Sequence, residues 1–196
     1  GTSVPANLGK GFLIDGITLG SSTPTISVSN PFNNAGWAFF NEGANGTGSY
    51  ASGPATPPLG LGSANLNVDA NGRHNIATLA YAGTRLDQLT QLSYSTHQVS
   101  GNPAAAISLQ FGMDYNLNDA DTSFQGRLVY EPYVNGTVQQ NTWQTWNALN
   151  GRFWATRAPF NATCPQANPC TLQQVLTAWP NAGIHADNSV NFFGLF

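Results

Sequence analysis

The stretch that decides the fold is Ile107-Ser108-Leu109-Gln110-Phe111-Gly112-Met113, in which apolar residues alternate with small or polar ones. Successive side chains of an extended strand point to opposite faces, so this period of two predicts a β-strand with one dry face. Leu128 and Tyr130 repeat the pattern less cleanly further along the chain. The sequence therefore predicts a sheet that packs one face against a core.

Short runs rich in β-branched and aromatic residues continue on both sides of this stretch. The chain has 21 Gly and 12 Pro, and together with Asn they interrupt it about every eight to twelve residues. The β-prone runs are residues 12–19, 25–29, 36–40, 64–68, 75–81, 91–96, 106–115, 124–133, 142–146, 152–155 and 190–193. This spacing predicts an all-β fold, an antiparallel β-sandwich or jelly roll. We expect residues 21–196 to form the sandwich and residues 1–20 to supply an N-terminal strand.

One helix is expected, over residues 171–179 near the C-terminus. Thr171 and Gln174 have the spacing of a capping box. Leu172, Val175, Leu176 and Trp179 then follow at helical spacing, and a proline at position 180 ends the run. A single further turn is expected at residues 85–89.

Charged residues are scarce, at 8% of the 196 residues against a usual share near ~25%. Lys and Arg number 6 against 9 Asp and Glu, so no basic face is available to neutralise a phosphate backbone. Nucleic-acid binding is thereby excluded as a main role. No uninterrupted apolar run approaches ~18 residues, so no membrane-spanning helix is expected. Asn, Gln, Ser and Thr must supply the surface polarity, which is typical of a secreted or cell-surface protein.

The two cysteines, Cys164 and Cys170, enclose a short loop that contains two prolines. This spacing favours a disulfide over half of a zinc site, because no second Cys/His pair completes a zinc site. A disulfide suits an oxidising compartment and so predicts an extracellular or cell-surface location. Asn-x-Ser/Thr sequons at Asn45, Asn135 and Asn161 are candidate glycosylation sites.

Residues capable of catalysis are few. The three histidines are far apart in the sequence, and neither a metalloprotease motif nor a Gly-x-Ser-x-Gly elbow is present. Glu42 and Glu131 are the only glutamates. A glycosidase could use them as acid and base, but the favoured interpretation is that each caps a turn or pairs with one of the few arginines. We predict no catalytic residues and no enzyme activity.

The richest polar cluster lies between two predicted strands, at residues 114–121. Oxygen-bearing side chains at nearly alternate positions resemble a calcium loop: Asp114, Asn116, Asn118, Asp119 and Asp121. The glycine and the final glutamate of an EF-hand are missing, because Asp119 and Gln125 occupy those positions. The alternative is a turn rich in Asx motifs. No cofactor is required by the sequence, and calcium is the one candidate.

Aromatic residues gather in the C-terminal third. Exposed rings would stack on sugar faces, whereas buried rings would fill the core beneath the helix, and burial is favoured. These residues are Trp143, Trp146, Phe153, Trp154, Phe160 and Trp179.

Three stretches carry a resemblance to a known family. The first is Gly46-Thr47-Gly48-Ser49-Tyr50, followed by Gly53-Pro54-Ala55-Thr56-Pro57-Pro58-Leu59-Gly60. The second is Tyr81-Ala82-Gly83-Thr84-Arg85-Leu86, followed by Leu89-Thr90-Gln91-Leu92-Ser93-Tyr94-Ser95-Thr96. The third is Val129-Tyr130-Glu131-Pro132, followed by Trp143-Gln144-Thr145-Trp146-Asn147-Ala148-Leu149-Asn150-Gly151 and Phe153-Trp154.

Over residues 36–193 the chain resembles a widespread, poorly characterised family of secreted prokaryotic β-sandwich domains. The resemblance implies a jelly-roll-like module of cell-surface and adhesin-like proteins, with no established catalytic residues. Domains of this family often carry an aspartate-rich calcium turn between the two middle strands. Asn116 and Asn118 replace acidic residues of that turn here.

The ends of the chain depart from the family pattern. Such domains usually finish with a strand similar to G-(F/Y)-V-D-(N/G)-(F/V/I)-T-(L/I)-G, but this pattern stands near the start, at residues 12–20. The closing strand either folds back within its own chain or completes a neighbouring subunit, as in a donor-strand polymer. The apolar residues of this expected assembly strand are Phe12, Leu13, Ile14, Ile17 and Leu19.

These observations predict a structural subunit of an extracellular filament or surface layer, whose partner is a second copy of itself or a tandem repeat. The alternative is a glycan-binding or adhesin-like module of a cell-surface protein. A glycoside-active enzyme using Glu42 or Glu131 is a more distant third.

Overall fold

The computed structural model describes residues 11–20, 37–43, 45–60 and 62–186. For residues 11–20 it gives the backbone and its pairing. The strands predicted at residues 25–29 and 190–193 lie outside the described residues.

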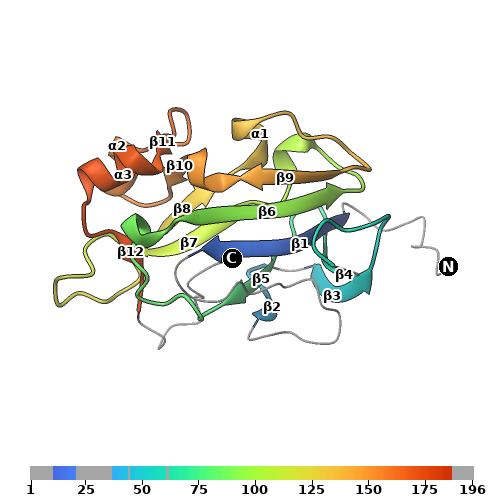
Figure 1. Cartoon of the computed structure of the whole chain (residues 1–196), viewed down its shortest axis with the longest axis horizontal. Helices are drawn as coiled ribbons and strands as arrows, with labels where there is room; N and C mark the ends of the chain where they lie inside the picture. Colours follow the sequence, from blue (N-terminus) through green and yellow to red (C-terminus); the bar gives the residue numbers. More distant parts are fainter. Residues whose placement is uncertain (1–10, 21–36, 44, 61, 187–196) are drawn as a thin grey trace.

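Two five-stranded antiparallel sheets form the fold, which confirms the predicted all-β class (Figure 1). The first sheet has the order β3-β4-β1-β6-β9. Its strands are β1 (Gly11–Gly20), β3 (Gly46–Ser52), β4 (Gly62–Val68), β6 (Gln91–Gln98) and β9 (Trp143–Asn147). The N-terminal strand β1 therefore lies in the middle of a sheet, between strands that come much later in the sequence.

The second sheet has the order β11-β10-β8-β7-β12. Its strands are β7 (Leu109–Asp114), β8 (Arg127–Tyr130), β10 (Arg152–Ala155), β11 (Cys170–Thr171) and β12 (Gly183–Ile184). A separate antiparallel pair is made by β2 (Trp37–Asn41) and β5 (His74–Thr78). The alternation at residues 107–113 is thus realised in β7, where Leu109, Phe111 and Met113 are fully buried.

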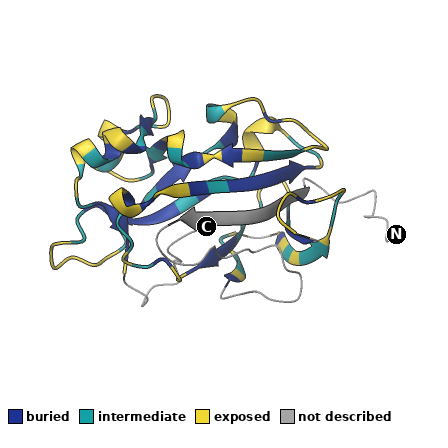
Figure 2. Cartoon of the chain, in the orientation of Figure 1, coloured by how far each residue is buried: buried dark blue, intermediate teal, exposed yellow. Residues whose placement is uncertain are grey.

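Aromatic rings fill the core, and one pair of rings joins the two sheets. The ring of Tyr94 on β6 lies 5.9 Å from that of Tyr130 on β8, edge to face. Phe153 on β10 stacks at 6.1 Å on Phe111 of β7 and lies 5.5 Å from Tyr130. Figure 2 shows β7 and β8 dark blue along most of their length, as expected for strands covered on both faces.

The predicted helix is confirmed as α3 (Leu172–Ala178), and both hydrogen bonds of its capping box are formed by Thr171 and Gln174. It lies with α2 (Phe160–Thr163) and β11 at one end of the molecule (Figure 1). The single turn expected near residue 85 is η1 (Leu86–Gln88). The remaining short elements are α1 (Pro132–Asn135), η2 (Pro103–Ala105) and η3 (Ala148–Asn150).

Strand β3 was not among the predicted strands, because its residues are mostly Gly, Ser and Thr. The glycines have a packing reason. A Cβ on Gly46 would collide with Asn41 and His74, and one on Gly48 would collide with Phe39 and His74. The missing side chains therefore let the first sheet approach the β2–β5 pair closely.

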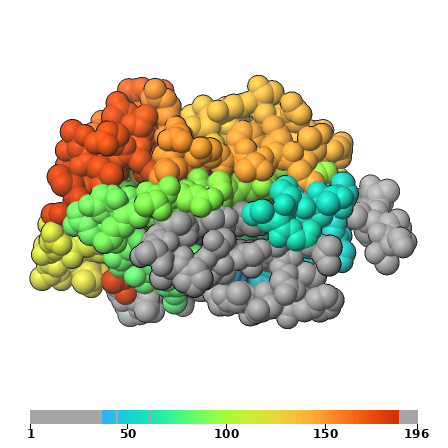
Figure 3. Space-filling model, viewed as in Figure 1, coloured from blue at the N-terminus to red at the C-terminus, as the bar shows by residue number. Residues whose placement is uncertain are grey.

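The C-terminal part of the described chain gathers on one side of the molecule. In the space-filling view most of the orange and red residues lie together above a green band, and a few red atoms lie below it (Figure 3). Among the described residues, no helix combines the length and the apolar character that a bilayer crossing requires.

Candidate functional site

The expected assembly strand is β1, which has backbone partners on both sides. On one side Phe12 pairs with Leu66 and Ile14 with Ala64, both on β4. On the other side β1 pairs with β6 from Phe12 opposite Gln98 to Gly20 opposite Gln91. Its register shifts between Asp15 and Thr18, so Ile17 lies at an irregularity of the pairing with β6.

The strands that flank β1 present buried residues to it. Ala64 and Leu66 on β4 are 0% and 5% exposed, and Thr96 and Gln98 on β6 are 3% and 1% exposed. Because these four residues are covered in the assembled sheet, the position between β4 and β6 is a deep one and not a surface edge.

A cavity of about 490 Å³ lies between the sheets and the β2–β5 pair. Both glutamates of the chain line it, although 89 residues separate Glu42 from Glu131. Its apolar wall comes from both five-stranded sheets and from β5 and includes Leu66, Val68, Ile76, Tyr94, Leu109 and Val129. Its size lies within the range of small-molecule sites.

One polar group of this cavity is the ion pair of Glu42 with Arg127. The guanidinium of Arg127 donates from Nη1 to Glu42 Oε2 at 2.9 Å and from Nη2 to the other carboxylate oxygen. Nη1 also donates to Gln110 Oε1 at 3.2 Å. Burial, and secondly repulsion from Arg157, lower the pKa of Arg127 to about 10, so the guanidinium stays charged at neutral pH. The interpretation of Glu42 as the partner of an arginine is confirmed.

The second polar group is centred on Glu131, at the start of α1. Its Oε2 accepts hydrogen bonds from Trp154 Nε1 at 2.9 Å and from Gln166 Nε2 at 3.0 Å. The indole of Trp154 is half-buried and lines the cavity. Sequence reasoning singled out the two glutamates but missed Arg127, Gln110 and Gln166, because only the packing of distant strands brings these side chains together.

The expected calcium loop is stabilised by its own hydrogen bonds. Asp114, Asp119 and Asp121 each accept a backbone N–H two residues further on, at 2.8, 2.9 and 3.0 Å. Asn116 Nδ2 donates to Asp119 Oδ2 at 2.9 Å. These are the Asx turns of the alternative interpretation. Burial is the main cause that raises the pKa of Asp114, and Asn118 is exposed.

The loop borders a second cavity of about 440 Å³, where Tyr115 stacks on Phe160 at 3.6 Å and meets Trp179 at 4.8 Å. In the described part of the chain, no group of three or more His, Cys, Asp or Glu side chains is arranged to hold a metal ion. The calcium site stays a prediction of at most weak binding.

Removing divalent ions is therefore expected to leave stability almost unchanged. Thermal melts with EDTA and with added calcium should have midpoints within about 1 °C of each other, since an ion that binds weakly adds little stability. A structural calcium ion at 100 times its Kd would add about 2.7 kcal/mol, or about 5–10 °C for a chain of this size. A drop of that size on adding EDTA would contradict the prediction.

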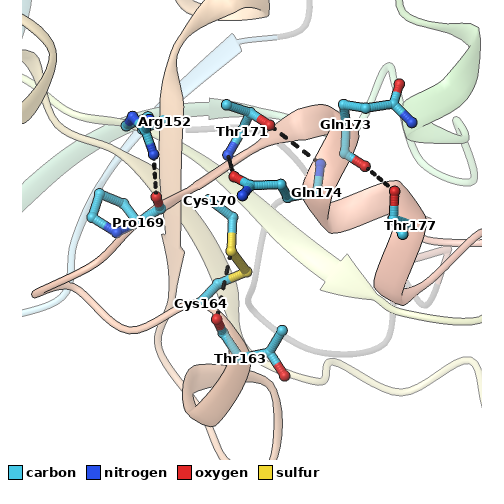
Figure 4. Close-up of a disulfide and its surroundings, with 9 residues drawn as sticks. All are labelled: Arg152, Thr163, Cys164, Pro169, Cys170, Thr171, Gln173, Gln174 and Thr177. Atoms are coloured by element: carbon cyan, nitrogen blue, oxygen red, sulfur yellow. Dashed lines mark hydrogen bonds between the residues drawn. A yellow bond between two sulfur atoms is a disulfide. The ribbon is translucent and has the colours of Figure 1, made fainter.

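The predicted disulfide joins Cys164 and Cys170, whose Cα atoms are 5.4 Å apart (Figure 4). Both cysteines are buried, at 0% and 7% exposure. Cys170 pairs with Phe153 in the β10–β11 register, and the next residue, Thr171, caps α3. The bridge thus closes the loop that connects the end of α2 to β11, the edge strand of the second sheet.

Removing this bridge by the double substitution Cys164→Ala with Cys170→Ala is expected to lower the free energy of unfolding by about 2 kcal/mol. The closed loop is short, so the loss stays below the ~3 kcal/mol of a fifteen-residue loop. Urea denaturation with and without reducing agent measures it. The reductant should destabilise only the unsubstituted protein. Equal stability of both proteins under oxidising conditions would contradict the expectation.

The three sequons differ in accessibility. Asn161 on α2 is exposed, and so is Asn45, whose Nδ2 donates to Asp69 at 2.7 Å. Asn135 is half-buried, and its Nδ2 donates to the carbonyl oxygens of Glu131 and Arg152 at 3.0 and 3.1 Å. An N-linked sugar replaces one Nδ2 hydrogen, so Asn135 is the least suited of the three to modification in the folded state.

The aromatic residues of the C-terminal third divide into two groups. Trp146 and Phe153 are buried, at 8% and 0% exposure, as the favoured interpretation expected. The others are half-buried: Trp143, Trp154, Phe160 and Trp179. Of these, Trp143 donates its indole N–H to the carbonyl of Pro54 at 2.9 Å.

Comparisons of the chain with protein-family models, with curated proteins and with solved structures found no match.

Proposed function

We propose that this protein is a structural, non-enzymatic subunit of an extracellular filament or surface layer, assembled by exchange of β1 between copies. The observation that carries the proposal is the place of β1 in the middle of the first sheet, with partners on both sides. A β1 strand from a neighbouring copy would meet the same backbone groups of β4 and β6. Both exchanged and self-paired forms therefore satisfy the same hydrogen bonds.

The apolar sequence of β1 makes the docked strand strongly stabilising, whether it comes from the same chain or from a neighbouring copy. Burying its five large apolar side chains at ~1.5–3 kcal/mol each contributes roughly 8–15 kcal/mol before the entropy of association is subtracted. Pairing on both sides also removes two unpaired strand edges, which would otherwise recruit other chains without specificity. When β1 is exchanged between identical copies, the open edges of β4 and β6 pair with one specific strand.

An extracellular location is supported by two features. The Cys164–Cys170 disulfide persists in oxidising compartments. The chain is also poor in charge, with 8% charged residues, so its polarity rests on neutral amide and hydroxyl groups.

Electron microscopy and gel filtration of the purified full chain test the proposal. Filaments or sheets, together with elution far above the mass of a 20.7 kDa monomer, are the expected result. A monomer at all concentrations up to the millimolar range, with no ordered assemblies on the grid, would contradict it.

A glycan-binding or adhesin-like role is the second candidate. It is favoured by the 490 Å³ cavity, which combines an apolar wall, an indole ring and hydrogen-bonding side chains. The two roles are compatible, because many surface structures also carry binding sites.

A further inference from the structure

We infer that the cavity lined by Glu42, Gln110, Arg127, Glu131, Trp154 and Gln166 binds a neutral saccharide. These six residues are called the polar wall of the cavity below. The inference names a ligand class and a site for the second candidate role and rests on it. It does not depend on the exchange of β1.

The charge of the polar wall argues for a neutral ligand. The carboxylate of Glu42 is neutralised by the guanidinium of Arg127, which contacts both of its oxygens. Glu131 contributes a carboxylate whose Oε2 already accepts two N–H groups. Arg73, an exposed side chain, also lines the cavity. Two arginines and two glutamates therefore cancel in charge, and the lining favours neither an anion nor a cation.

The hydrogen-bonding groups of the polar wall suit vicinal hydroxyls. Carboxylate oxygens accept hydrogen bonds, and guanidinium and amide N–H groups donate them. One acceptor and one donor side by side can therefore bond two neighbouring hydroxyls of a sugar, since each hydroxyl both donates and accepts. The wall also holds these groups in place: Gln110 accepts from Arg127 at 3.2 Å and donates to Ser108 at 2.7 Å. Side chains fixed in this way lose little entropy when a ligand binds.

The remaining lining suits the apolar faces of a sugar ring. Trp154 is half-buried and lines the cavity. Its indole N–H donates to Glu131, and this hydrogen bond orients the ring. An aromatic face and the aliphatic side chains of Ile107 and Val129 can cover the C–H surface of a pyranose. A volume near 490 Å³ accommodates a short oligosaccharide segment and not a large macromolecule.

Isothermal titration of the full-length protein with neutral and charged oligosaccharides tests the inference. The neutral probes are hexasaccharides of β-1,4-glucose, β-1,4-mannose, β-1,4-N-acetylglucosamine and α-1,6-glucose, and the charged probe is a hexamer of galacturonate. At least one neutral probe is expected to bind with a Kd below 1 mM. The Trp154→Ala variant should weaken that binding at least tenfold.

Two further variants separate loss of the site from loss of the fold. Gln166 is exposed, so Gln166→Ala should keep the thermal midpoint. It should weaken sugar binding severalfold, because the Glu131 carboxylate loses one of the two N–H donors that hold it in place. Trp143 lies outside the polar wall and is half-buried like Trp154, so Trp143→Ala is the matched control and should bind normally.

The inference is overturned if no neutral probe binds at 1 mM, if galacturonate binds more tightly than every neutral probe, or if Trp143→Ala and Trp154→Ala weaken binding equally. Failure to bind sugar leaves filament formation unaffected. A failure of this site and a failure of assembly are therefore recorded by separate measurements.

Discussion

Replacing Ile14 with Asp is expected to abolish assembly, leaving no filaments on the grid and a shift of the protein to low-mass or misfolded species. Ile14 pairs with Ala64 on one side and Thr96 on the other, and both are buried. A carboxylate introduced between these buried partners would lose its hydration, which costs several kcal/mol or more. Electron microscopy and gel filtration provide the measurement.

The matched control is Leu79→Asp, since Leu79 is 37% exposed and can keep a carboxylate hydrated. This variant should assemble like the unsubstituted protein. Filaments of normal length from Ile14→Asp would show that the pairing of β1 is not needed for assembly.

A cysteine pair distinguishes exchange between copies from pairing within one chain. Leu13 pairs with Asn65 across β1 and β4, so Leu13→Cys with Asn65→Cys places two thiols opposite each other. Exchange between copies is expected to give a ladder of covalent oligomers on a non-reducing gel, whereas each single variant gives dimers at most. A cross-linked monomer alone would contradict strand exchange.

The second large effect is expected from Phe153→Ala, which should lower the free energy of unfolding by about 3–5 kcal/mol. Phe153 is 0% exposed, and its ring contacts those of Phe111 and Tyr130. Truncation removes this three-ring contact and leaves a cavity that the surrounding strands fill only partly. Urea denaturation monitored by circular dichroism measures the change.

Val99→Ala serves as the control for this truncation, because Val99 is 37% exposed. Its effect should stay within about 0.5 kcal/mol, as for most surface substitutions. A loss below 1 kcal/mol in Phe153→Ala would mean that the core can close around the missing ring.

Local patterns in the sequence predicted the elements that depend on local physics. The alternation around Phe111 predicted β7, and the Thr171–Gln174 spacing predicted α3 to within a residue at each end. The short spacing of Cys164 and Cys170 predicted their bridge. In each case a few neighbouring residues carry the whole signal.

Other features could not be predicted because their cause lies elsewhere in the fold. Strand β3 is built from Gly, Ser and Thr, and its glycines are explained only by the side chains of Phe39 and His74 that pack over them. Helices α1 and α2 have four residues each, which is too short for a helical period to show. Glu42 meets Arg127 across 85 positions of sequence, and no local pattern links them.

The central place of β1 also bears on the rate of folding. More than 50 residues separate Phe12 from its partner Leu66, and more than 80 separate it from Gln98. Such non-local pairing raises the contact order, and sandwiches of this kind fold in milliseconds to seconds.

Until β1 docks, β4 and β6 each present an open edge. The rate at which β1 docks within its own chain is independent of protein concentration. Capture of another chain's strand accelerates with protein concentration. Dilution during refolding should therefore favour closed monomers, and a high protein concentration should favour linked ones.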